Sequence, residues 1–204
     1  MTCIIFAGGV IEDYKKLYLP EYDYVICADS GLSHVHKLGI KADLILGDFD
    51  SSEYIPDGNN VIKFPKEKDD TDTMLAVKKA IELNYDEIWI YGGLGGRIDH
   101  TIANIQTLYY ISNHGKKGYL ADKNNFITVQ LSGSFKYKKY NGFYFSLLSL
   151  SDECTGVTLK GVAYPMENGT LSSDFPLGIS NEIIDDFAEV SIKSGALLII
   201  YSKD

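Results

Sequence analysis

Two aspartates separated by one residue, Asp48 and Asp50, directly follow a short apolar segment of this 204-residue chain. In extended backbone, side chains at positions i and i+2 point to the same side about 6.5 to 7 Å apart, so both carboxylates can address one divalent metal ion or a pair of ions. The preceding Gly47 lets the backbone approach a ligand closely. The same residue types also form turns at strand ends, so this pattern alone leaves a metal site and a simple turn both open.

A second acidic segment contains Asp69, Asp70 and Asp72, just before an amphipathic stretch. Asp70 or Thr71 suits the N-cap of a helix, and the helix dipole favours Asp72 in the first turn. Capping explains one or two of these acids but explains less well why three carboxylates lie within four positions, because like charges at that spacing repel unless a cation or a basic residue lies between them. A bound divalent ion would supply that compensation.

A third segment, residues 92–100, is suited to bind phosphate oxygens. Four of its first five residues are glycines, and they connect an apolar run to a predicted helix. Backbone N–H groups and a helix N-terminus in this arrangement bind phosphate, and Arg97 would add a charge-assisted fork. Each glycine costs about 0.5 to 1 kcal/mol relative to alanine, so four of them favour close approach to a ligand. Neither GxxxxGK[ST] nor GxGxxG is present.

Histidines are the remaining candidates for proton transfer. His100 and Asn104 are four residues apart and therefore share one face of the predicted helix, and we interpret His100 as an orienting or structural residue rather than a general base. His34 and His36 have no partner at metal-ligand spacing and are predicted to lie on the surface.

The elements that must position these residues alternate between short apolar runs and helical periodicity, which is typical of a parallel sheet covered by helices. We predict strands at residues 3–7, 24–28, 44–46, 61–64, 87–91 and 118–121. Two helices, 73–83 and 98–111, are each expected to bury one apolar stripe. The first stripe consists of Met74, Val77 and Ile81, and the second of Ile98, Ile102, Ile105 and Tyr109. Ligands bind outside the carboxyl ends of the strands in such a sheet, which is where the candidate residues lie.

The second half of the chain changes to short alternating strands separated by polar turn residues, which indicates an antiparallel β-sandwich. The predicted strands are residues 126–131, 143–150, 155–160, 170–173, 186–192 and 196–201. Residues 122–125 are polar and rich in turn formers, so they mark the boundary. We therefore predict a mostly parallel, Rossmann-like α/β domain at 1–122 and an antiparallel β-sandwich domain at 123–204.

The formal net charge of −9, from 19 basic and 28 acidic residues, argues against a surface for duplex nucleic acid. An acidic protein can still bind a polyphosphate when divalent ions lie between its carboxylates and the phosphate. Three cysteines form neither a disulfide pattern nor a metal motif, and no segment reads as a signal peptide or a membrane helix. We therefore expect a cytoplasmic protein with no membrane partner.

Taken in order, these segments resemble the thiamine pyrophosphokinase family. The matching segments are residues 28–31, 47–51, 69–72, 92–100 with Asn104, 161–166 and 178–182, which cover nearly the whole chain. The resemblance implies that the hydroxyl of thiamine attacks the β-phosphorus of ATP, that the diphosphoryl group moves as a unit, and that AMP leaves. It also implies Mg²⁺ as cofactor and a homodimer, with thiamine between the α/β domain of one subunit and the β domain of the other.

The resemblance assigns expected roles to individual residues. Asp48, Asp50 and Asp72 are expected to bind Mg²⁺ and to form the catalytic set with Arg97 and Asp99. Asp99 is expected either as a further metal ligand or as a contact to the attacking hydroxyl. The expected ATP-binding residues are Asp29, Ser30, Gly31, Lys68, Thr71, Gly93, Gly95, Gly96, Arg97, His100 and Asn104, and the expected thiamine-binding residues are Tyr164, Ser180 and Asn181.

Two other classes of protein remain as alternatives. A metal-dependent phosphohydrolase also places an Asp-x-Asp pair after an apolar strand, although there the pair usually follows the first strand, and here it follows the third. A nucleotide- or vitamin-binding module without catalysis would not need Asp48, Asp50, Asp72 and Asp99 together.

Overall fold

The computed structural model describes residues 1–49, 58–65, 67 and 69–204. The chain divides into two compact units, Met1–Lys123 and Asn124–Asp204, which are described separately. None of the helices in the described residues is long and apolar enough to cross a membrane.

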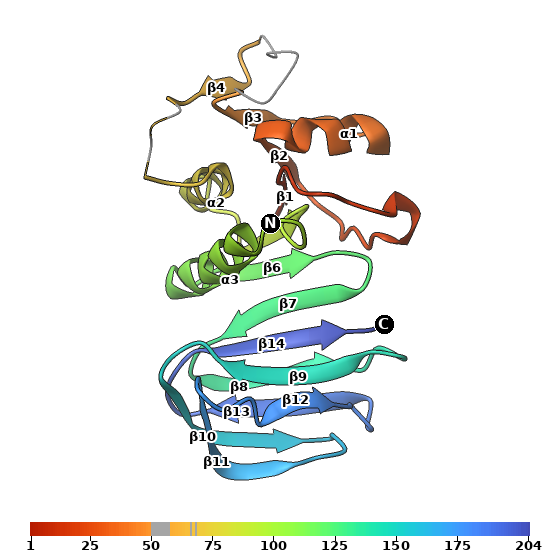
Figure 1. Cartoon of the computed structure of the whole chain (residues 1–204), viewed down its shortest axis with the longest axis vertical. Coiled ribbons are helices and arrows are strands. Elements are labelled where there is room, and N and C mark those ends of the chain that lie inside the picture. The colour runs from red at the N-terminus through yellow and green to blue at the C-terminus, as the bar shows by residue number, and fades with distance from the viewer. Residues whose placement is uncertain (50–57, 66, 68) are drawn as a thin grey trace. The chain divides into compact units, whose positions relative to one another are not determined.

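Unit 1 contains strands that lie side by side in the order β6-β5-β1-β2-β3-β4, and every pairing between them is parallel (Figure 1). Their bounds are β1 Thr2–Phe6, β2 Tyr24–Ala28, β3 Leu44–Gly47, β4 Val61–Lys63, β5 Glu87–Tyr91 and β6 Lys117–Ala121. Strand β1 is central, and its residues Cys3 to Phe6 have 0% exposure. Continuous apolar strands of this kind require a sheet covered on both faces, which confirms the predicted α/β class.

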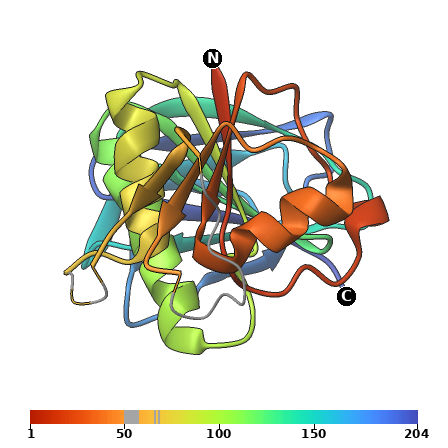
Figure 2. The same ribbon diagram turned by 90° about the horizontal axis from the view of Figure 1, so that it is seen from above.

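Helices cover this sheet from two sides. Helix α1 (Leu32–Leu38) lies on one side, and α2 (Asp72–Glu82) and α3 (Ile98–Asn113) lie on the other (Figure 2). Two short 3₁₀ helices, η1 (Tyr14–Lys16) and η2 (Asp29–Gly31), follow β1 and β2. The carboxyl ends of β1, β2 and β5 therefore lead directly into helix starts or into the loops that precede them.

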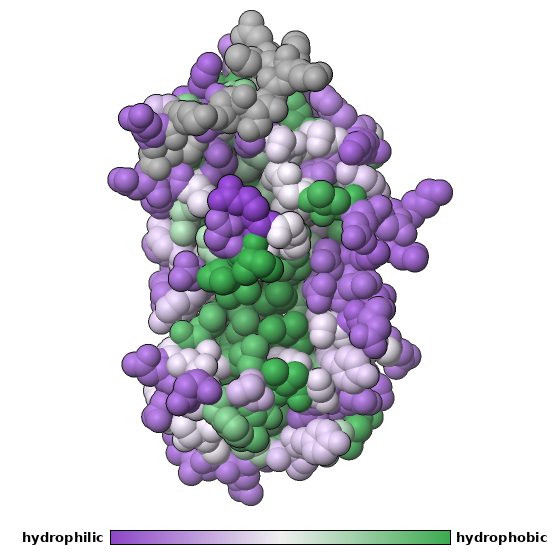
Figure 3. Space-filling view, in the orientation of Figure 1, coloured by the Kyte–Doolittle hydropathy of each residue, from purple (hydrophilic) through white to green (hydrophobic). Residues whose placement is uncertain are grey.

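The prediction for the buried face of α3 was wrong. Ile98 and Ile102 are 68% and 52% exposed, Tyr109 is 37% exposed, and Ile105 is only partly buried. Apolar residues gather on the molecular face that carries α3 (Figure 3). The buried residues of α3 are instead Asn104, Thr107, Leu108 and Ile111.

The reason for this rotation of α3 lies in strand β6. A Cβ atom on Gly118 would lie 2.9 Å from Cδ1 of Ile111 and 3.1 Å from Cδ2 of Leu108. Because Gly118 has no side chain, Leu108 and Ile111 can pack directly against the sheet at this position. Because α3 is apolar on two faces, periodicity could not identify the face that packs.

Helix α2 packs through smaller residues than expected. Val77 is buried as predicted, but Met74 and Ile81 are only partly buried. Ala76 and Ala80 are completely buried and bring the helix close to the sheet.

His34 is buried rather than on the surface, contrary to prediction, with only 5% of its area exposed, whereas His36 on the same helix is exposed as expected. Its neighbours Tyr14 and Gly9 are 20 and 25 residues away in the chain, so no local pattern indicates its burial.

Unit 2 forms two antiparallel layers, with strand orders β12-β9-β14-β7 and β11-β10-β13-β8. Their bounds are β7 Asn125–Gln130, β8 Gly133–Lys138, β9 Tyr144–Ser149, β10 Glu153–Lys160, β11 Met166–Ser172, β12 Gly178–Asn181, β13 Phe187–Ile192 and β14 Leu197–Ser202. One hydrophobic core joins residues of both layers, such as Phe145 and Leu197 with Val157 and Val190. This confirms an antiparallel β unit with one core between two sheets.

Strands β8 and β12 were not predicted. Both lie at the end of a strand order, where only one side is paired. Strand β8 is exposed along nearly its whole length, and β12 has only four residues and an irregular register. Short, polar edge strands lack the alternating pattern by which buried strands are recognised.

Candidate functional site

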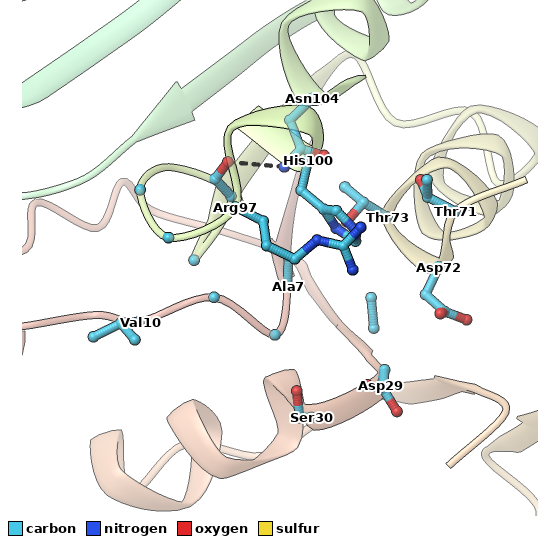
Figure 4. Close-up of a pocket in the computed structure, with 17 residues that line it drawn as sticks. Ala7, Val10, Asp29, Ser30, Thr71, Asp72, Thr73, Arg97, His100 and Asn104 are labelled. Atoms are coloured by element: carbon cyan, nitrogen blue, oxygen red, sulfur yellow. Dashed lines mark hydrogen bonds between the residues drawn. The ribbon is translucent and has the colours of Figure 1, made fainter. Parts of the chain in front are cut away.

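A pocket of about 370 Å³ lies in unit 1, a size suited to a small ligand. It is lined by residues 7–10 after β1, residues 28–30 at the end of β2, residues 71–73 at the start of α2, and residues of the glycine loop and α3 (Figure 4). The strand order explains its position. From β1 the chain builds the sheet outward through β4 and then returns to place β5 on the other side of β1, and ligands bind at such a switch point.

Backbone contacts join the loops after β1 and β5 behind this pocket. The N–H of Ala7 donates to Tyr91 O and that of Gly9 donates to Gly92 O, both at 2.8 Å. A Cβ on Gly9 would lie 2.3 Å from Gly92 O, and one on Gly92 would lie 2.5 Å from Ala7 O. Glycine is therefore required at both positions because two backbones meet there.

At Gly95 and Gly96, glycine is favoured by the backbone conformation rather than by a close contact. Their φ angles are 79° and 65°, in the left-handed region, while an added Cβ would meet nothing within 4 Å. The loop thus turns sharply while leaving its backbone open to the pocket.

Asn104 and His100 both line the pocket from one face of α3, as their spacing predicts. Asn104 is 5% exposed, and its Nδ2 donates to Gly93 O at 2.8 Å (Figure 4). Its side chain therefore holds the glycine loop against the first turns of α3.

Arg97 and Asp99 form an exposed two-point ion pair. Arg97 Nε donates to Asp99 Oδ1 at 3.1 Å, and its NH2 donates to Oδ2 at 2.6 Å. The guanidinium lowers the pKa of Asp99, and the carboxylate raises the pKa of Arg97. Among the described residues, the pocket lining includes Arg97 but not Asp99. Because both side chains are well exposed, an incoming phosphate can compete for the guanidinium.

Asp29 and Asp72 line the pocket from η2 and from the first position of α2 (Figure 4). Asp29 has φ 50°, a left-handed conformation that aspartate adopts more readily than most residues. A Cβ on Gly47 would lie 3.0 Å from Asp29 Cα, so the end of β3 runs close to Asp29. Ser30 joins Asp29 in the lining, and the neighbouring Gly31 is buried.

The remaining predicted acidic and basic residues are Asp48, Asp50 and Lys68. Asp48 follows β3 and is half-buried, outside the described lining of the pocket. Asp50 and Lys68 lie outside the described residues. Within the part of the chain that the structure describes, no group of three or more His, Cys, Asp or Glu is arranged to hold a metal ion.

The start of α2 is built by Thr71 rather than Asp70. Thr71 is the N-cap, and its Oγ1 accepts from Met74 N–H at 3.1 Å while the residue also lines the pocket. Asp70 binds Lys78 Nζ at 2.6 Å. A basic residue thus compensates one of the three crowded carboxylates, and the cap directs Asp72 into the first turn.

Two groups of lining residues were missed from the sequence. Residues 7–10 follow β1, and Thr73 belongs to the start of α2. The signal for the first group was present, because Gly8 and Gly9 follow an apolar strand just as the glycines of the later loop do.

The predicted residues of unit 2 lie close together. Tyr164 is 73% exposed and Ser180 is exposed, but Asn181 is buried. Asn181 Oδ1 accepts from Tyr164 N–H at 3.0 Å, and its Nδ2 donates to Tyr164 O at 2.8 Å. The amide of Asn181 therefore holds the backbone of Tyr164 in place.

Comparison with known proteins gives one consistent result. Residues 15–120 match the family described as "Thiamin pyrophosphokinase, catalytic domain", and residues 134–197 match "Thiamin pyrophosphokinase, vitamin B1 binding domain". The chain is 34% identical to the thiamine pyrophosphokinase of Bacillus subtilis over 100% of its own length and 99% of that protein. The crystal structure of thiamine pyrophosphokinase from Bacillus subtilis superposes with a TM-score of 0.90 at 33% identity, covering 100% of both chains. That from Geobacillus thermodenitrificans gives 0.86 at 29% identity, covering 100% of this chain and 98% of the other.

Proposed function

The chain belongs to the thiamine pyrophosphokinase family, and we propose that it transfers the diphosphoryl group of ATP to the hydroxyl of thiamine, which yields thiamine diphosphate and AMP. The observation that carries this proposal is the pocket at the switch point between β1 and β5. It combines open glycine backbone, Arg97 and two carboxylates in a single cavity. Phosphoryl transfer depends mainly on positioning and on charge neutralisation, which these groups can provide.

The polyphosphate of ATP lies on the glycine loop in this proposal. The backbone of Gly93, Gly95 and Gly96 faces the phosphate oxygens. The Arg97 guanidinium leaves its ion pair with Asp99 and binds the phosphate instead. The geometry supports this exchange because the ion pair is exposed and Arg97 reaches over the pocket (Figure 4). The other proposed nucleotide contacts are Asp29, Ser30, Gly31, Lys68, Thr71, His100 and Asn104.

We assign Mg²⁺ to Asp48, Asp50 and Asp72. Carboxylate oxygens are the hard donors that Mg²⁺ prefers, and Mg²⁺ usually takes one or two of them together with water and phosphate oxygens. Asp72 in the pocket lining fits this donor set. When bound, the ion neutralises charge on the transferred group and on departing AMP.

In the transfer step, one bond to the β-phosphorus of ATP is replaced by another. The thiamine oxygen forms a bond to the β-phosphorus while the bond from that phosphorus to the oxygen shared with the α-phosphate breaks. Asp99, released by Arg97, accepts a hydrogen bond from the attacking hydroxyl and takes its proton. Asn104 and the N-cap Thr71 keep the glycine loop and α2 in place during the reaction.

Thiamine is assigned to unit 2, which also carries dimerisation. Tyr164 offers an aromatic face to the cationic vitamin, and Ser180 offers a hydrogen-bonding hydroxyl. The neighbouring apolar residues Phe175, Leu177 and Ile179 are 62%, 55% and 51% exposed, which supports a surface that a second subunit covers. We therefore propose a homodimer. We also propose that unit 1 is the ATP- and metal-binding part and that the protein is cytoplasmic.

Product identification tests this function. Purified protein is incubated with Mg²⁺, thiamine and ATP labelled on its β-phosphorus, and the products are separated. Label in thiamine diphosphate together with unlabelled AMP is the expected result. Labelled ADP with thiamine monophosphate would indicate transfer of a single phosphoryl group, and free phosphate would indicate a hydrolase. Binding of both substrates without turnover would indicate a binding module.

A further inference from the structure

His34 is buried behind the pocket wall and lies outside the described pocket lining. Its Nε2 lies 2.8 Å from Gly9 O, and its Nδ1 lies 2.7 Å from the Tyr14 hydroxyl. A carbonyl oxygen can only accept, so Nε2 must carry the proton toward Gly9. The Gly9 carbonyl thus selects this tautomer, and the neutral ring then accepts at Nδ1 from Tyr14 O–H.

The hydrogen bond from His34 is one of a continuous series. Gly9 accepts from His34 through its carbonyl and donates to Gly92 O through its N–H. The series therefore runs from Tyr14 on η1 through His34 on α1 to the loops after β1 and β5. Gly9 and Gly92 both line the pocket.

Two adjacent glycines need such an external anchor. Gly8 and Gly9 can adopt many backbone conformations, and ordering them costs more conformational entropy than ordering any other residue pair. The His34 ring is itself fixed by packing beside Phe6 and Tyr14, with ring centroids 6.3 Å and 5.9 Å away. A rigid donor can therefore determine which way the Gly9 peptide faces.

We propose that His34 is a positioning residue for ATP: through the Gly9 carbonyl it holds residues 7–10 in the conformation that receives the nucleotide, and the Tyr14 hydroxyl, by donating to Nδ1, holds the ring in the orientation that does so. This rests on the proposed use of the pocket for ATP. His34 itself touches neither substrate.

The first test measures the segment without any ligand. Amide hydrogen exchange is followed for residues 7–10 in the wild type, His34→Leu, His34→Gln and His36→Leu. Faster exchange at Gly9 in His34→Leu is expected, while His34→Gln, which keeps an N–H donor, and His36→Leu, altered at an exposed position of the same helix, stay near the wild type. Equal exchange in all four proteins would overturn the proposal.

The second test measures ATP binding and steady-state kinetics in the same proteins. His34→Leu is expected to raise the Kd and KM for ATP about tenfold, in line with loss of one hydrogen bond and loop order, with the KM for thiamine unchanged. His34→Gln should restore most of the affinity. Altered exchange with an unchanged Kd for ATP would contradict the proposal, and a wild type that binds no ATP would instead refute the proposed function.

A third variant keeps the test independent of whether His34→Leu folds. Tyr14→Phe leaves the imidazole and the packing in place but removes the hydroxyl that donates to Nδ1. The Nε2–H tautomer is expected to persist, because the Gly9 carbonyl selects it, while exchange at Gly9 becomes faster and the Kd for ATP rises a few-fold. Wild-type exchange and wild-type affinity in Tyr14→Phe would refute the role given to Tyr14.

Discussion

The carboxylate of Asp72 lies in the pocket at the first position of α2, whereas Asp70, two residues earlier, is paired with Lys78. Replacing Asp72 by asparagine keeps the shape and removes the charge. We expect Asp72→Asn to lower kcat by at least about 100-fold, because the proposed metal loses an anionic ligand, with the circular dichroism spectrum unchanged. Asp70→Asn is the matched control and should retain activity.

The result that would contradict this assignment is near-normal turnover of Asp72→Asn at saturating Mg²⁺. It would remove Asp72 from the proposed metal ligands while leaving the family membership untouched.

Protonation of His34 gives a pH dependence to stability. Burial is the largest cause that lowers the pKa of His34 below its ordinary value of 6.5, and Lys37 on the same helix lowers it further, against raising by the carbonyls of Gly9 and Ala7. The Tyr14 hydroxyl also faces the ring. The unfolded chain therefore binds a proton first as pH falls, so His34 stabilises the fold fully above pH 6.5 and loses this contribution below it.

We expect the free energy of unfolding of the wild type to decrease more steeply than that of His34→Gln as pH falls below 6.5. Urea unfolding at several pH values measures this difference, with His36→Gln as control. Parallel pH profiles for the wild type and His34→Gln would show that folding does not lower the pKa of His34.

Residue types alone were enough to select much of the pocket. Asp72, Arg97 and the glycine loop were chosen for chemistry that their side chains or backbone can perform, and Asp29 was added by the family resemblance. The structure brings these described residues into one lining. His34 could not be found in this way, because its role depends on Tyr14 and Gly9, which approach it only after the sheet has formed.

The N-cap of helix α2 is a single hydrogen bond, in which a threonine side chain accepts from a backbone N–H. Thr71→Ala removes the acceptor for Met74 N–H, so we expect the free energy of unfolding to fall by about 1 kcal/mol. Thr71→Ser retains the hydroxyl and should stay within a few tenths of a kcal/mol of the wild type. Thermal unfolding of the three proteins measures the effect.

Equal stability of Thr71→Ala and Thr71→Ser would show that water replaces the cap. In that case the position of Asp72 would depend on the packing of Ala76 and Ala80 rather than on the N-cap.

Buried parallel strands were the elements best predicted from the sequence. Runs such as residues 24–28 and 88–91 are apolar or aromatic, and the strands predicted at 24–28 and 87–91 coincide with β2 and β5. The orientation of α3 was beyond the sequence, because only the contact with Gly118 decides between two apolar faces. Edge strands such as β12 depend on pairing with a distant partner and carry little local signal.

The three cysteines can serve as probes of unfolding in both units. Cys3 and Cys27 lie in unit 1 and Cys154 lies in unit 2, all at 0% exposure. Burial raises the pKa of Cys27 to about 12 and also raises that of Cys3, so neither thiol ionises near neutral pH. We expect the native protein to resist alkylation at pH 8.

Alkylation at increasing urea concentration, followed by mass spectrometry, measures the unfolding of each unit. Cys3 and Cys27 should become labelled together, because β1 and β2 are paired throughout. Cys154 reports unit 2 independently. Labelling of Cys27 at a lower urea concentration than Cys3 would show that β2 separates from β1 before the unit unfolds.

The strand orders also constrain how the protein is made on the ribosome. Strand β1 is synthesised first, yet its second neighbour, β5, ends at Tyr91, so the centre of the sheet remains half-paired until that residue has left the exit tunnel. In unit 2 the pairing is delayed further, because β7, the first strand of the unit, pairs with β14, its last strand. Nascent chains stalled before residue 197 should therefore carry a folded unit 1 and a β7 that lacks its β14 partner, so until β14 emerges this exposed strand edge is a site where chaperones are needed.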